Sequence, residues 1–364
     1  MPDEIELKLR IDADDIPRLH RHRAILDHLS GEPKTRRLIS TYYDTPDLQL
    51  MRQQINLRVR HMAGGWFQAV KGRGQALAGL HQRMEWEDII SGSEPDFSKI
   101  TDPSLAGIFS PMLKKALAPI FVTDVERTEW LLSLADGTII EVAADLGRLE
   151  IQGKSEPISE VELELKQGEA WRLFELAADL QKDFPLWLEN VSKAERGYRH
   201  LSATPLSPSP ARAVELPETT PTVQAFQAIG LECLRQMQAN QELTLLANLE
   251  ARQYMHAAIR RLRLACRLFR CTDPALRSEV QWLERLFDNA HRWKEPGDEL
   301  LEQLPASCRE RNVVQERLDR QRYSTERRLF DALSSQRYQS LLLRLGIVCT
   351  KKPGKDDAEP TKIH

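Results

Sequence analysis

The chain has 364 residues, enough for two domains, with 29% charged and 41% apolar residues and a net charge of −3. This composition is typical of a globular protein, and a net charge so near zero argues against a specific nucleic-acid partner bound through overall basicity. No apolar run reaches the roughly 18 residues that a membrane-spanning helix needs, so we expect no membrane partner.

The first predicted element is a strand with charges at alternate positions. Glu4, Glu6 and Lys8 are separated by apolar residues. Residues two apart on an extended chain point to the same face, so two carboxylates and an ammonium share one face of this strand. No apolar segment with a cleavage site precedes the strand, and we therefore expect a cytoplasmic location.

The first 200 residues contain seven more segments with the alternation, or the β-branched and aromatic content, of strands. With the first, they lie near residues 4–11, 38–44, 55–62, 65–71, 82–90, 121–134, 138–146 and 158–166. Helical patterns fall at 13–29, around 103–118 and at 169–183. Eight strands joined mostly by short turns predict an antiparallel sheet that closes on itself.

Charged residues recur in the later strands. They are Arg58 and Arg60 in the third strand, Lys71 in the fourth, Arg83, Glu85 and Glu87 in the fifth, Arg127 in the sixth, Glu141 and Asp145 in the seventh, and Glu160, Glu162 and Glu164 in the eighth. A single strand of this kind usually turns its charges to solvent and its apolar face to a core. For all the strands together we favour the reverse, a barrel with a polar interior and an apolar outer wall that the helices cover.

Such a lumen needs a ligand that satisfies charges of both signs, because buried charges without partners are unstable. A metal-complexed polyphosphate is such a ligand. Phosphate oxygens suit the basic side chains, since arginine gives forked contacts and lysine a point charge. These are Arg58, Arg60, Lys71, Arg127 and Lys193. The hard cations Mg²⁺ and Mn²⁺ suit the carboxylates Glu4, Glu6, Glu160 and Glu162.

The second half of the chain has a different composition. Residues 203–222 carry five prolines and few large apolar residues, which predicts an exposed, semi-rigid linker. Residues 222–350 are rich in Leu, Ala, Arg, Gln and Glu, typical of an all-α helical bundle. The five cysteines all lie in this half, odd in number and without CxxC spacing, so we expect neither a disulfide framework nor a zinc site.

A basic stripe follows one predicted helix at residues 250–270. Its members recur at three- and four-residue steps: Arg252, His256, Arg260, Arg263, Arg267 and Arg270. They form either the solvated face of a bundle helix or an anion-binding stripe, and the sequence leaves both interpretations open.

Six motifs of the first half, taken in order, resemble the CYTH domain, also called the triphosphate tunnel metalloenzymes. They are EIELK at 4–8, YYDTPDLQL at 42–50, LRVR at 57–60, VKGRG at 70–74, EVELEL at 160–165 and SKAERGY at 192–198. The resemblance covers residues 1–200. It implies an α+β fold in which an eight-stranded antiparallel β-barrel tunnel with flanking helices binds a triphosphate lengthwise.

The resemblance also implies roles for individual residues. Its metal ligands would be Glu4, Glu6, Glu160 and Glu162, with Glu164 and Asp145 as further candidates. Its phosphate binders would be Lys8, Arg58, Arg60, Arg127 and Lys193. Tyr42 and Lys71 stand where some members place a catalytic pair, although a tyrosine ring packed under the barrel is an alternative for Tyr42. In a hydrolytic phosphoryl transfer, Lys71 aided by Tyr42 would stabilise or protonate the leaving oxygen, and a second metal ion or Glu85 would position the attacking water.

The helical half resembles a CHAD domain, a module associated with polyphosphate binding. The resemblance rests on MHAAIRRLR at 255–263 and ALSSQRYQSLLLRL at 332–345. Gln253 and His256 stand where that family has a histidine and an arginine. A dimerisation or packing role is therefore the alternative. We expect a CYTH domain over residues 1–202, the linker over 203–221, the CHAD-like domain over 222–350 and a disordered polar tail over 351–364.

Together these features predict a metal-dependent inorganic triphosphatase that cleaves tripolyphosphate to pyrophosphate and phosphate with Mg²⁺ or Mn²⁺. Polyphosphate bound by the helical domain and a homodimer are further expectations. One rival is a nucleoside or thiamine triphosphatase or a class IV adenylyl cyclase, although no motif indicates a pocket for an organic group. The other rival is a polyphosphate-binding scaffold that turns over little.

Overall fold

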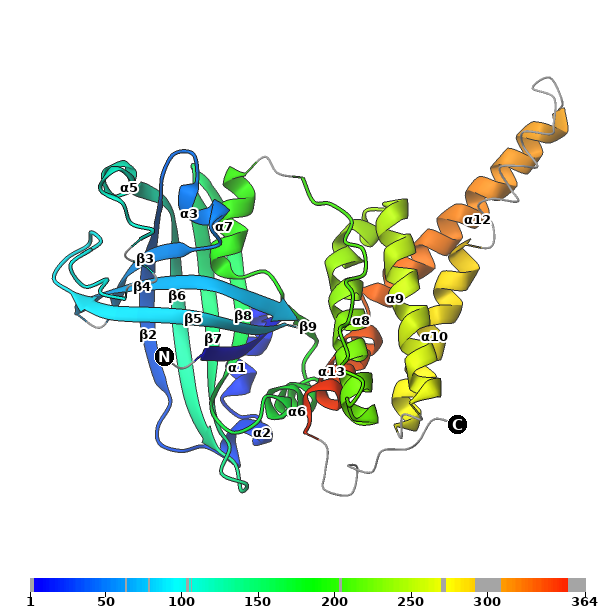
Figure 1. Cartoon of the computed structure of the whole chain (residues 1–364), viewed down its shortest axis with the longest axis horizontal. Helices are drawn as coiled ribbons and strands as arrows, with labels where there is room; N and C mark the ends of the chain where they lie inside the picture. Colours follow the sequence, from blue (N-terminus) through cyan, green and yellow to red (C-terminus); the bar gives the residue numbers. More distant parts are fainter. Residues whose placement is uncertain are drawn as a thin grey trace. The chain divides into compact units, whose positions relative to one another are not determined.

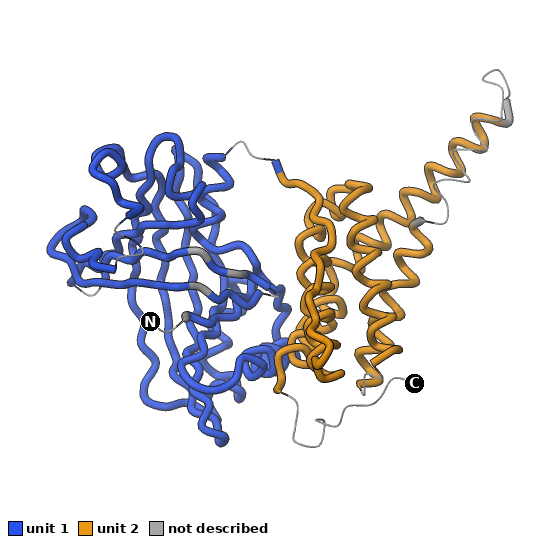
Figure 2. The backbone as a smooth tube through the Cα atoms, in the orientation of Figure 1, with its two compact units in different colours: residues 1–205 blue, residues 206–364 orange. Residues whose placement is uncertain are grey.

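The computed structural model describes residues 3–62, 64–77, 79–102, 105, 107–202, 205–269, 273–291 and 309–352. The chain divides into two compact units, residues 1–205 and residues 206–364 (Figure 2). The first unit mixes strands and helices, and the second is helical (Figure 1). The expected disordered tail lies outside the described residues from residue 353 onward.

In the described part of the first unit, nine strands form one antiparallel sheet (Figure 1). They are β1 (Asp3–Ile11), β2 (Lys34–Asp44), β3 (Asn56–Met62), β4 (Gly65–Leu77), β5 (Leu80–Ile90), β6 (Ala118–Ser133), β7 (Ile139–Ile151), β8 (Lys154–Gln167) and β9 (Leu186–Leu188). Their order is β5-β4-β3-β2-β6-β7-β8-β1-β9, and β1 also pairs with β5. That pairing closes the eight long strands into a barrel, which confirms the predicted fold; the short β9, beside β1, is an addition.

The predicted helices of this unit are present but shorter. The pattern at 13–29 is broken into η1 (Ala13–Asp15), α1 (Ile16–Leu19) and α2 (Arg23–Leu26). The break falls at His22, whose backbone is extended and whose side chain accepts a hydrogen bond from the backbone N–H of Ala24, so that it caps α2. The pattern at 169–183 becomes α6 (Trp171–Leu180), and the described part of 103–118 contains α5 (Pro111–Ala116).

The outer wall of the barrel is apolar. Four residues that alternate with the charges on β1 and β8 are fully buried: Leu7, Leu9, Val161 and Leu163. Helix α6 packs against these two strands and buries Phe174 and other apolar residues of its inner face. Each such side chain contributes about 1.5–3 kcal/mol on burial. The outer faces of β3 and β4 are covered in the same way by α3 (Gln49–Arg52) and α5.

One end of the barrel interior is also apolar. There the inward-facing residues belong to a hydrophobic cluster that continues into α7 (Lys193–Leu201): Leu38, Tyr42, Phe121, Val125, Leu149, Ile151, Ile158, Ala194 and Tyr198. Helix α7 begins at Ser192, whose side chain accepts a hydrogen bond from the backbone N–H of Glu195. A Cβ atom at Gly197 would lie 2.4 Å from the ring of Phe121, so a glycine is needed for this close approach.

The second unit is a helical bundle. Its described helices are α8 (Thr222–Leu245), α9 (Leu249–Leu268), α10 (Pro274–His291), α12 (Arg309–Leu333) and α13 (Gln336–Thr350) (Figure 1). The apolar face of α9, with Met255, Ile259 and Leu262, is fully buried, as the sequence pattern predicts. Within the described residues, no helix combines the length and hydrophobicity needed to cross a membrane.

Part of the proline-rich segment lies along α8. The backbone N–H of Ser209 donates to Asn240 (2.9 Å), whose side-chain amide donates to the carbonyl of Ser209 (2.8 Å). The backbone N–H of Arg212 donates to Glu232 (2.7 Å). Asn240 and Glu232 are buried, and an extended backbone supplies the hydrogen-bond partners that such groups need. This stretch is therefore docked on the helical unit.

Candidate active site

The barrel encloses a charged cavity of about 520 Å³, lined by all eight long strands and by the start of α7. Its lining includes Glu4, Glu6, Lys8, Tyr42, Arg58, Arg60, Lys71, Glu85, Arg127, Glu162, Glu164 and Lys193. The two other residues that the sequence singles out, Asp145 and Glu160, lie in contact with Lys193 at this wall. The structure therefore brings together every residue for which a site role was predicted.

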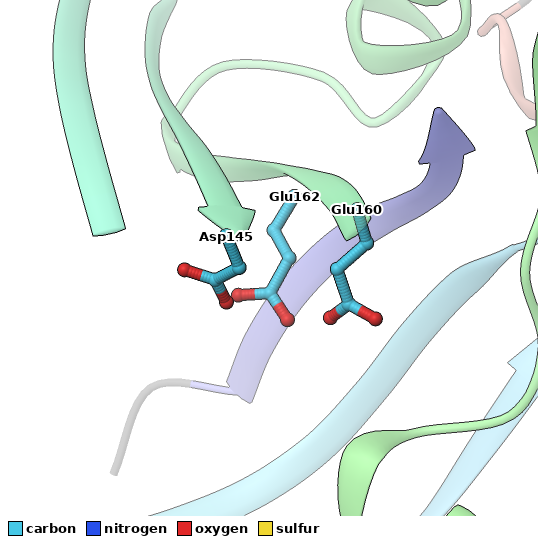
Figure 3. A group of neighbouring side chains, drawn as sticks. All are labelled: Asp145, Glu160 and Glu162. Atoms are coloured by element: carbon cyan, nitrogen blue, oxygen red, sulfur yellow. The ribbon is translucent and has the colours of Figure 1, made fainter. Parts of the chain in front are cut away.

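Three buried carboxylates meet at the cavity wall: Asp145 of β7 with Glu160 and Glu162 of β8 (Figure 3). Each offers an oxygen atom within 4.8 Å of oxygens of the other two. Strand register explains the meeting, because Asp145 pairs with Glu160 across the two strands and Glu162 is two residues further on the same face. Three like charges at this spacing are stable only with cations beside them.

Arg127 of β6 and Lys193 of α7 are those cations. Arg127 donates from Nε and Nη2 to the two oxygens of Asp145, at 2.6 Å each, and also contacts Glu162. Lys193 Nζ lies 2.6 Å from Asp145 and 3.0 Å from Glu162, and it contacts Glu160 as well. Because Arg127 offers two parallel donors, it fixes the orientation of Asp145 as well as its charge.

The three carboxyl groups differ in acidity. Burial alone raises the pKa of each. For Asp145, Arg127 and Lys193 outweigh burial and lower the pKa to about 2. For Glu162, Lys193, Lys8 and Arg127 outweigh burial and hold the pKa well below its usual range. For Glu160, burial prevails over Lys193 and Lys8 and raises the pKa.

Lys8 links β1 to this group. It contacts Glu162, and its Nζ lies 3.1 Å from Glu6 on the same strand face. Burial by itself would lower the pKa of Lys8, but Glu162 and Glu6 raise it. The ammonium therefore stays charged inside the barrel.

Lys71 and Glu85 face each other across β4 and β5. Lys71 Nζ lies 2.8 Å from Glu85 and 3.0 Å from both carboxylate oxygens of Glu4. Arg58 Nη2 lies 3.2 Å from Glu85. Burial would raise the pKa of Glu85, but Lys71 and Arg58 lower it to about 2. Such a carboxylate holds and orients neighbouring groups, but it is a weak proton acceptor at neutral pH.

Arg60 differs from the other basic residues of the cavity. Its Nε donates to the hydroxyl of Ser40 at 3.0 Å, and within the described residues no carboxylate forms an ion pair with it. Burial, and then the neighbouring Arg58 and Arg127, lower its pKa to about 10. The buried Nε of Arg58 also has no hydrogen-bond partner in the described part of the chain. This side of the lumen therefore has cationic donors in excess, as an anion site requires.

The carboxylate side has the donors that a divalent cation requires. The Oε2 atom of Glu160 is buried and accepts no hydrogen bond from the described residues; Arg196 Nη1, at 3.9 Å, is an ion-pair neighbour beyond bonding distance. With Asp145 and Glu162 close by, a set of hard oxygen donors of the kind preferred by Mg²⁺ and Mn²⁺ surrounds one point. The residues present therefore fit such an ion.

Tyr42 is packed at the apolar end of the cavity. Its ring stacks on Phe121 with centroids 4.5 Å apart, and only 3% of the residue is exposed. It lines the cavity and belongs to the apolar cluster at the α7 end. Across the strands it pairs with Arg58, whereas Lys71 pairs with Asn56.

Five further charged residues line the cavity without a predicted role: Arg36, Glu87, Glu129, Glu141 and Lys166. Arg36 contacts Glu129, and Lys166 lies 3.5 Å from Glu141 and 2.7 Å from Glu164. Strand β2 begins at Lys34, four residues before the predicted strand. Arg36 is two residues from Leu38, and this alternation is the sequence signal that could have placed Arg36 in the cavity. Glu129 likewise alternates with Arg127.

Part of the basic stripe of α9 is engaged inside the helical unit, whereas Arg260 and Arg267 are exposed. Arg263 contacts Glu284, and His256 lies 3.0 Å from Asp288. Arg252 is buried, and burial lowers its pKa. Arg270 lies outside the described residues. Polyphosphate binding by this stripe stays a prediction.

Comparison with known proteins gives two family matches. The CYTH domain matches residues 2–198, and the CHAD domain matches residues 228–363. An inorganic triphosphatase of Haemophilus influenzae is 35% identical over 204 residues, which cover 54% of this chain and 55% of that protein. The chain thus spans about half the length of this curated relative.

Two solved structures are also similar to parts of this chain. A Hippeastrum protein, a candidate adenylyl cyclase with a dominant triphosphatase activity, is 17% identical with a TM-score of 0.40, over 54% of this chain and 96% of that one. The CHAD domain of the plant Ricinus communis is 28% identical with a TM-score of 0.34, over 40% of this chain and 50% of that one. These TM-scores are too low for either structure to indicate a function for this chain.

Proposed function

Since this chain belongs to the CYTH family and carries a CHAD domain after its barrel, we propose that it is a metal-dependent inorganic triphosphatase. Its substrate would be tripolyphosphate, cleaved to pyrophosphate and phosphate with Mg²⁺ or Mn²⁺ in the cytoplasm. The name of the Haemophilus influenzae relative supports this reaction class.

The observation that carries the proposal is the division of the lumen into two sides. On one side Arg60 lies near Arg58 and Arg127, and the hydroxyl of Ser40 is its hydrogen-bond partner among the described residues. On the other side are the carboxylates around Glu160. A polyphosphate complexed with a divalent cation satisfies both sides at once, whereas a bare anion or a bare cation satisfies only one.

The chain's own residues would supply most of the catalysis. Arg58, Arg60 and Arg127 would bind the non-bridging oxygens, on which charge is spread in the transition state, and would hold the phosphorus in line for attack. Lys71, held between Glu4 and Glu85, would donate a hydrogen bond to the leaving oxygen. A divalent ion held by Asp145, Glu160 and Glu162 would supply further charge neutralisation on the phosphate oxygens.

The other predicted roles keep their place in the proposal, except that of Tyr42 as an aid to Lys71. Glu85, fully ionised, would orient the attacking water without acting as a strong base. Glu4, Glu6 and Glu164 remain candidate metal ligands, and Lys8 and Lys193 remain candidate phosphate binders. Tyr42 would serve as an end wall beside the reacting group, because its ring is packed on Phe121.

The test is phosphate release from tripolyphosphate with Mg²⁺ or Mn²⁺. We expect release by the wild-type chain and its loss in Glu4→Ala and in Arg58→Ala. The matched control is Glu126→Gln, an exposed carboxylate on the outer face of β6. Binding without release in the wild type would favour a scaffold, and faster turnover of ATP than of tripolyphosphate would favour a nucleotide enzyme. Either result would overturn the proposal.

A further inference from the structure

The exposure of the charged side chains changes steadily along the barrel. On β8, side-chain exposure falls from 38% at Lys166 through 28% at Glu164 and 10% at Glu162 to 2% at Glu160. On the neighbouring β7, which runs the opposite way, it falls from 27% at Glu141 to 0% at Asp145. Since Glu141 is paired with Glu164, and Asp145 with Glu160, both gradients point to the same open end.

Aromatic rings close the other end of the described lumen. The ring of Tyr42 stacks on Phe121, and Tyr198 of α7 meets Phe121 edge-on with centroids 5.6 Å apart. All three residues are less than a tenth exposed. These rings obstruct the described lumen on the side of β2, β6 and α7, and the open end, or mouth, is the one beside Glu164 and Lys166.

Six charged residues surround that mouth, and we name them the collar: Arg36, Glu87, Glu129, Glu141, Glu164 and Lys166. They are the outermost charged lining residues of β2, β5, β6, β7 and β8. Four carboxylates stand against two cations, so the collar carries a net negative charge at neutral pH. The anion side of the interior, by contrast, has Arg58, whose buried Nε has no hydrogen-bond partner among the described residues, and Arg60, whose Nε donates to the hydroxyl of Ser40.

We propose that the collar limits the length of the anion that this site accepts. The proposal rests on the proposed function, because it concerns the outer end of a polyphosphate whose inner end lies among Arg58, Arg60 and Arg127. A chain with one phosphate more than the interior holds must place that phosphate between the carboxylates of the collar. Repulsion there disfavours the longer chain and leaves tripolyphosphate bound in preference.

The experiment compares tetrapolyphosphate with tripolyphosphate on the full chain. Dissociation constants are measured by calorimetry without added divalent metal, and kcat/KM values are measured with Mg²⁺. The Glu129→Gln/Glu141→Gln double variant removes two collar charges that have no role in the proposed catalysis. Arg36→Gln removes a collar cation instead, and Glu126→Gln on the outer face of β6 is the matched control.

We expect the wild type to bind tripolyphosphate more tightly than tetrapolyphosphate. In the double variant the ratio of the two dissociation constants should be roughly three- to tenfold smaller, because two repulsive charges are gone. Arg36→Gln should increase the preference for tripolyphosphate over tetrapolyphosphate, and Glu126→Gln should leave this preference unchanged. Added salt should weaken the preference in the wild type more than in the double variant, since repulsion at a partly exposed mouth is screened.

Equal preference in the wild type and the double variant would overturn the collar proposal. A shift of the same size in Glu126→Gln would overturn it as well, because it would reflect overall charge and not the mouth. If the chain binds both anions but hydrolyses neither, the proposed function fails, and the ratio of dissociation constants still decides the role of the collar.

Discussion

Arg127 and Asp145 form a cross-strand pair in which two parallel hydrogen bonds of 2.6 Å join a guanidinium of β6 to a fully buried carboxylate of β7. Glu162 shares the guanidinium, and Lys193 reaches Asp145 from α7. The pair thus joins three strands and the helix that closes the lumen. The same contact that orients a candidate metal ligand also holds the barrel wall together.

The first prediction concerns the geometry of this pair. Arg127→Lys keeps the positive charge but loses the two parallel guanidinium donors, so Asp145 is no longer held in one orientation. We expect kcat/KM on tripolyphosphate to fall at least about tenfold while the chain stays folded. Arg127→Ala leaves buried carboxylates unpaired and should cost about 3–5 kcal/mol in the free energy of unfolding. Arg148→Lys, at an exposed arginine of β7, is the control for both the kinetics and the thermal unfolding.

The second prediction separates stability from function at Arg60. Burial, Arg58 and Arg127 all disfavour its charge, as its pKa of about 10 shows. Arg60→Gln should therefore raise the unfolding free energy of the ligand-free protein, by about 1–2 kcal/mol. It should also abolish the rise in Tm that tripolyphosphate gives the wild type, because that rise depends on binding. A variant that is less stable and still shifted by tripolyphosphate would contradict the assignment of an anion site.

The third prediction concerns metal binding at Asp145, Glu160 and Glu162. Manganese titrated in the absence of substrate and followed by its spin-resonance signal should bind the wild type. Glu160→Gln keeps the shape but removes one charged donor, so we expect the affinity to fall about tenfold or more. Glu156→Gln, on the same strand but outside the cavity lining, should bind as the wild type does. A chelator should stop phosphate release, and added Mg²⁺ or Mn²⁺ should restore it.

Much of the barrel was predictable because its strands carry strict alternation. Every predicted strand is present, and the polar interior follows from Glu4, Glu6, Glu160 and Glu162 having apolar neighbours that an outer helix could cover. Strand ends were less predictable. The predicted strand, residues 38–44, covers only the C-terminal part of β2, so Arg36 was left outside the strand although it lines the cavity.

Other features depend on contacts that no local pattern encodes. Tyr42 and Leu149 occupy inward positions like those of the charged residues, but they pack into the apolar end under α7. The docking of Ser209 on Asn240 depends on a buried polar residue 31 positions away. Proline content predicted an exposed, semi-rigid linker but not the surface on which part of this segment lies.

The fourth prediction is that residues 1–205 alone carry the activity. The cavity lining extends only from residue 4 to residue 194, and this segment forms one compact unit. A chain that ends at Pro205 should therefore fold and should release phosphate from tripolyphosphate within about threefold of the full-length rate. A truncated chain that folds, as judged by circular dichroism and thermal unfolding, and is inactive would assign the helical unit a part in catalysis.

The fifth prediction concerns the pH dependence of the helical unit at His256. Its imidazole is buried between α9 and α10, 3.0 Å from Asp288 and stacked on Phe287. Burial lowers its pKa, and Arg260 acts in the same direction, while Asp288 and Glu284 oppose the shift. Because the folded state binds this proton more weakly than the unfolded state, the unfolded state takes up more protons below the ordinary histidine pKa of about 6.5.

It follows that His256 stabilises the fold fully above about pH 6.5 and that this contribution is lost as the pH falls through the lowered folded pKa. Replacing His256 with Gln should flatten the loss of stability between about pH 7 and pH 5, by less than about 1 kcal/mol. The imidazole resonance that disappears in the variant should titrate in the wild type below the ordinary histidine value. A resonance that titrates above that value would mean that Asp288 outweighs burial, and the variant should then be less sensitive to a rise in pH, not to a fall.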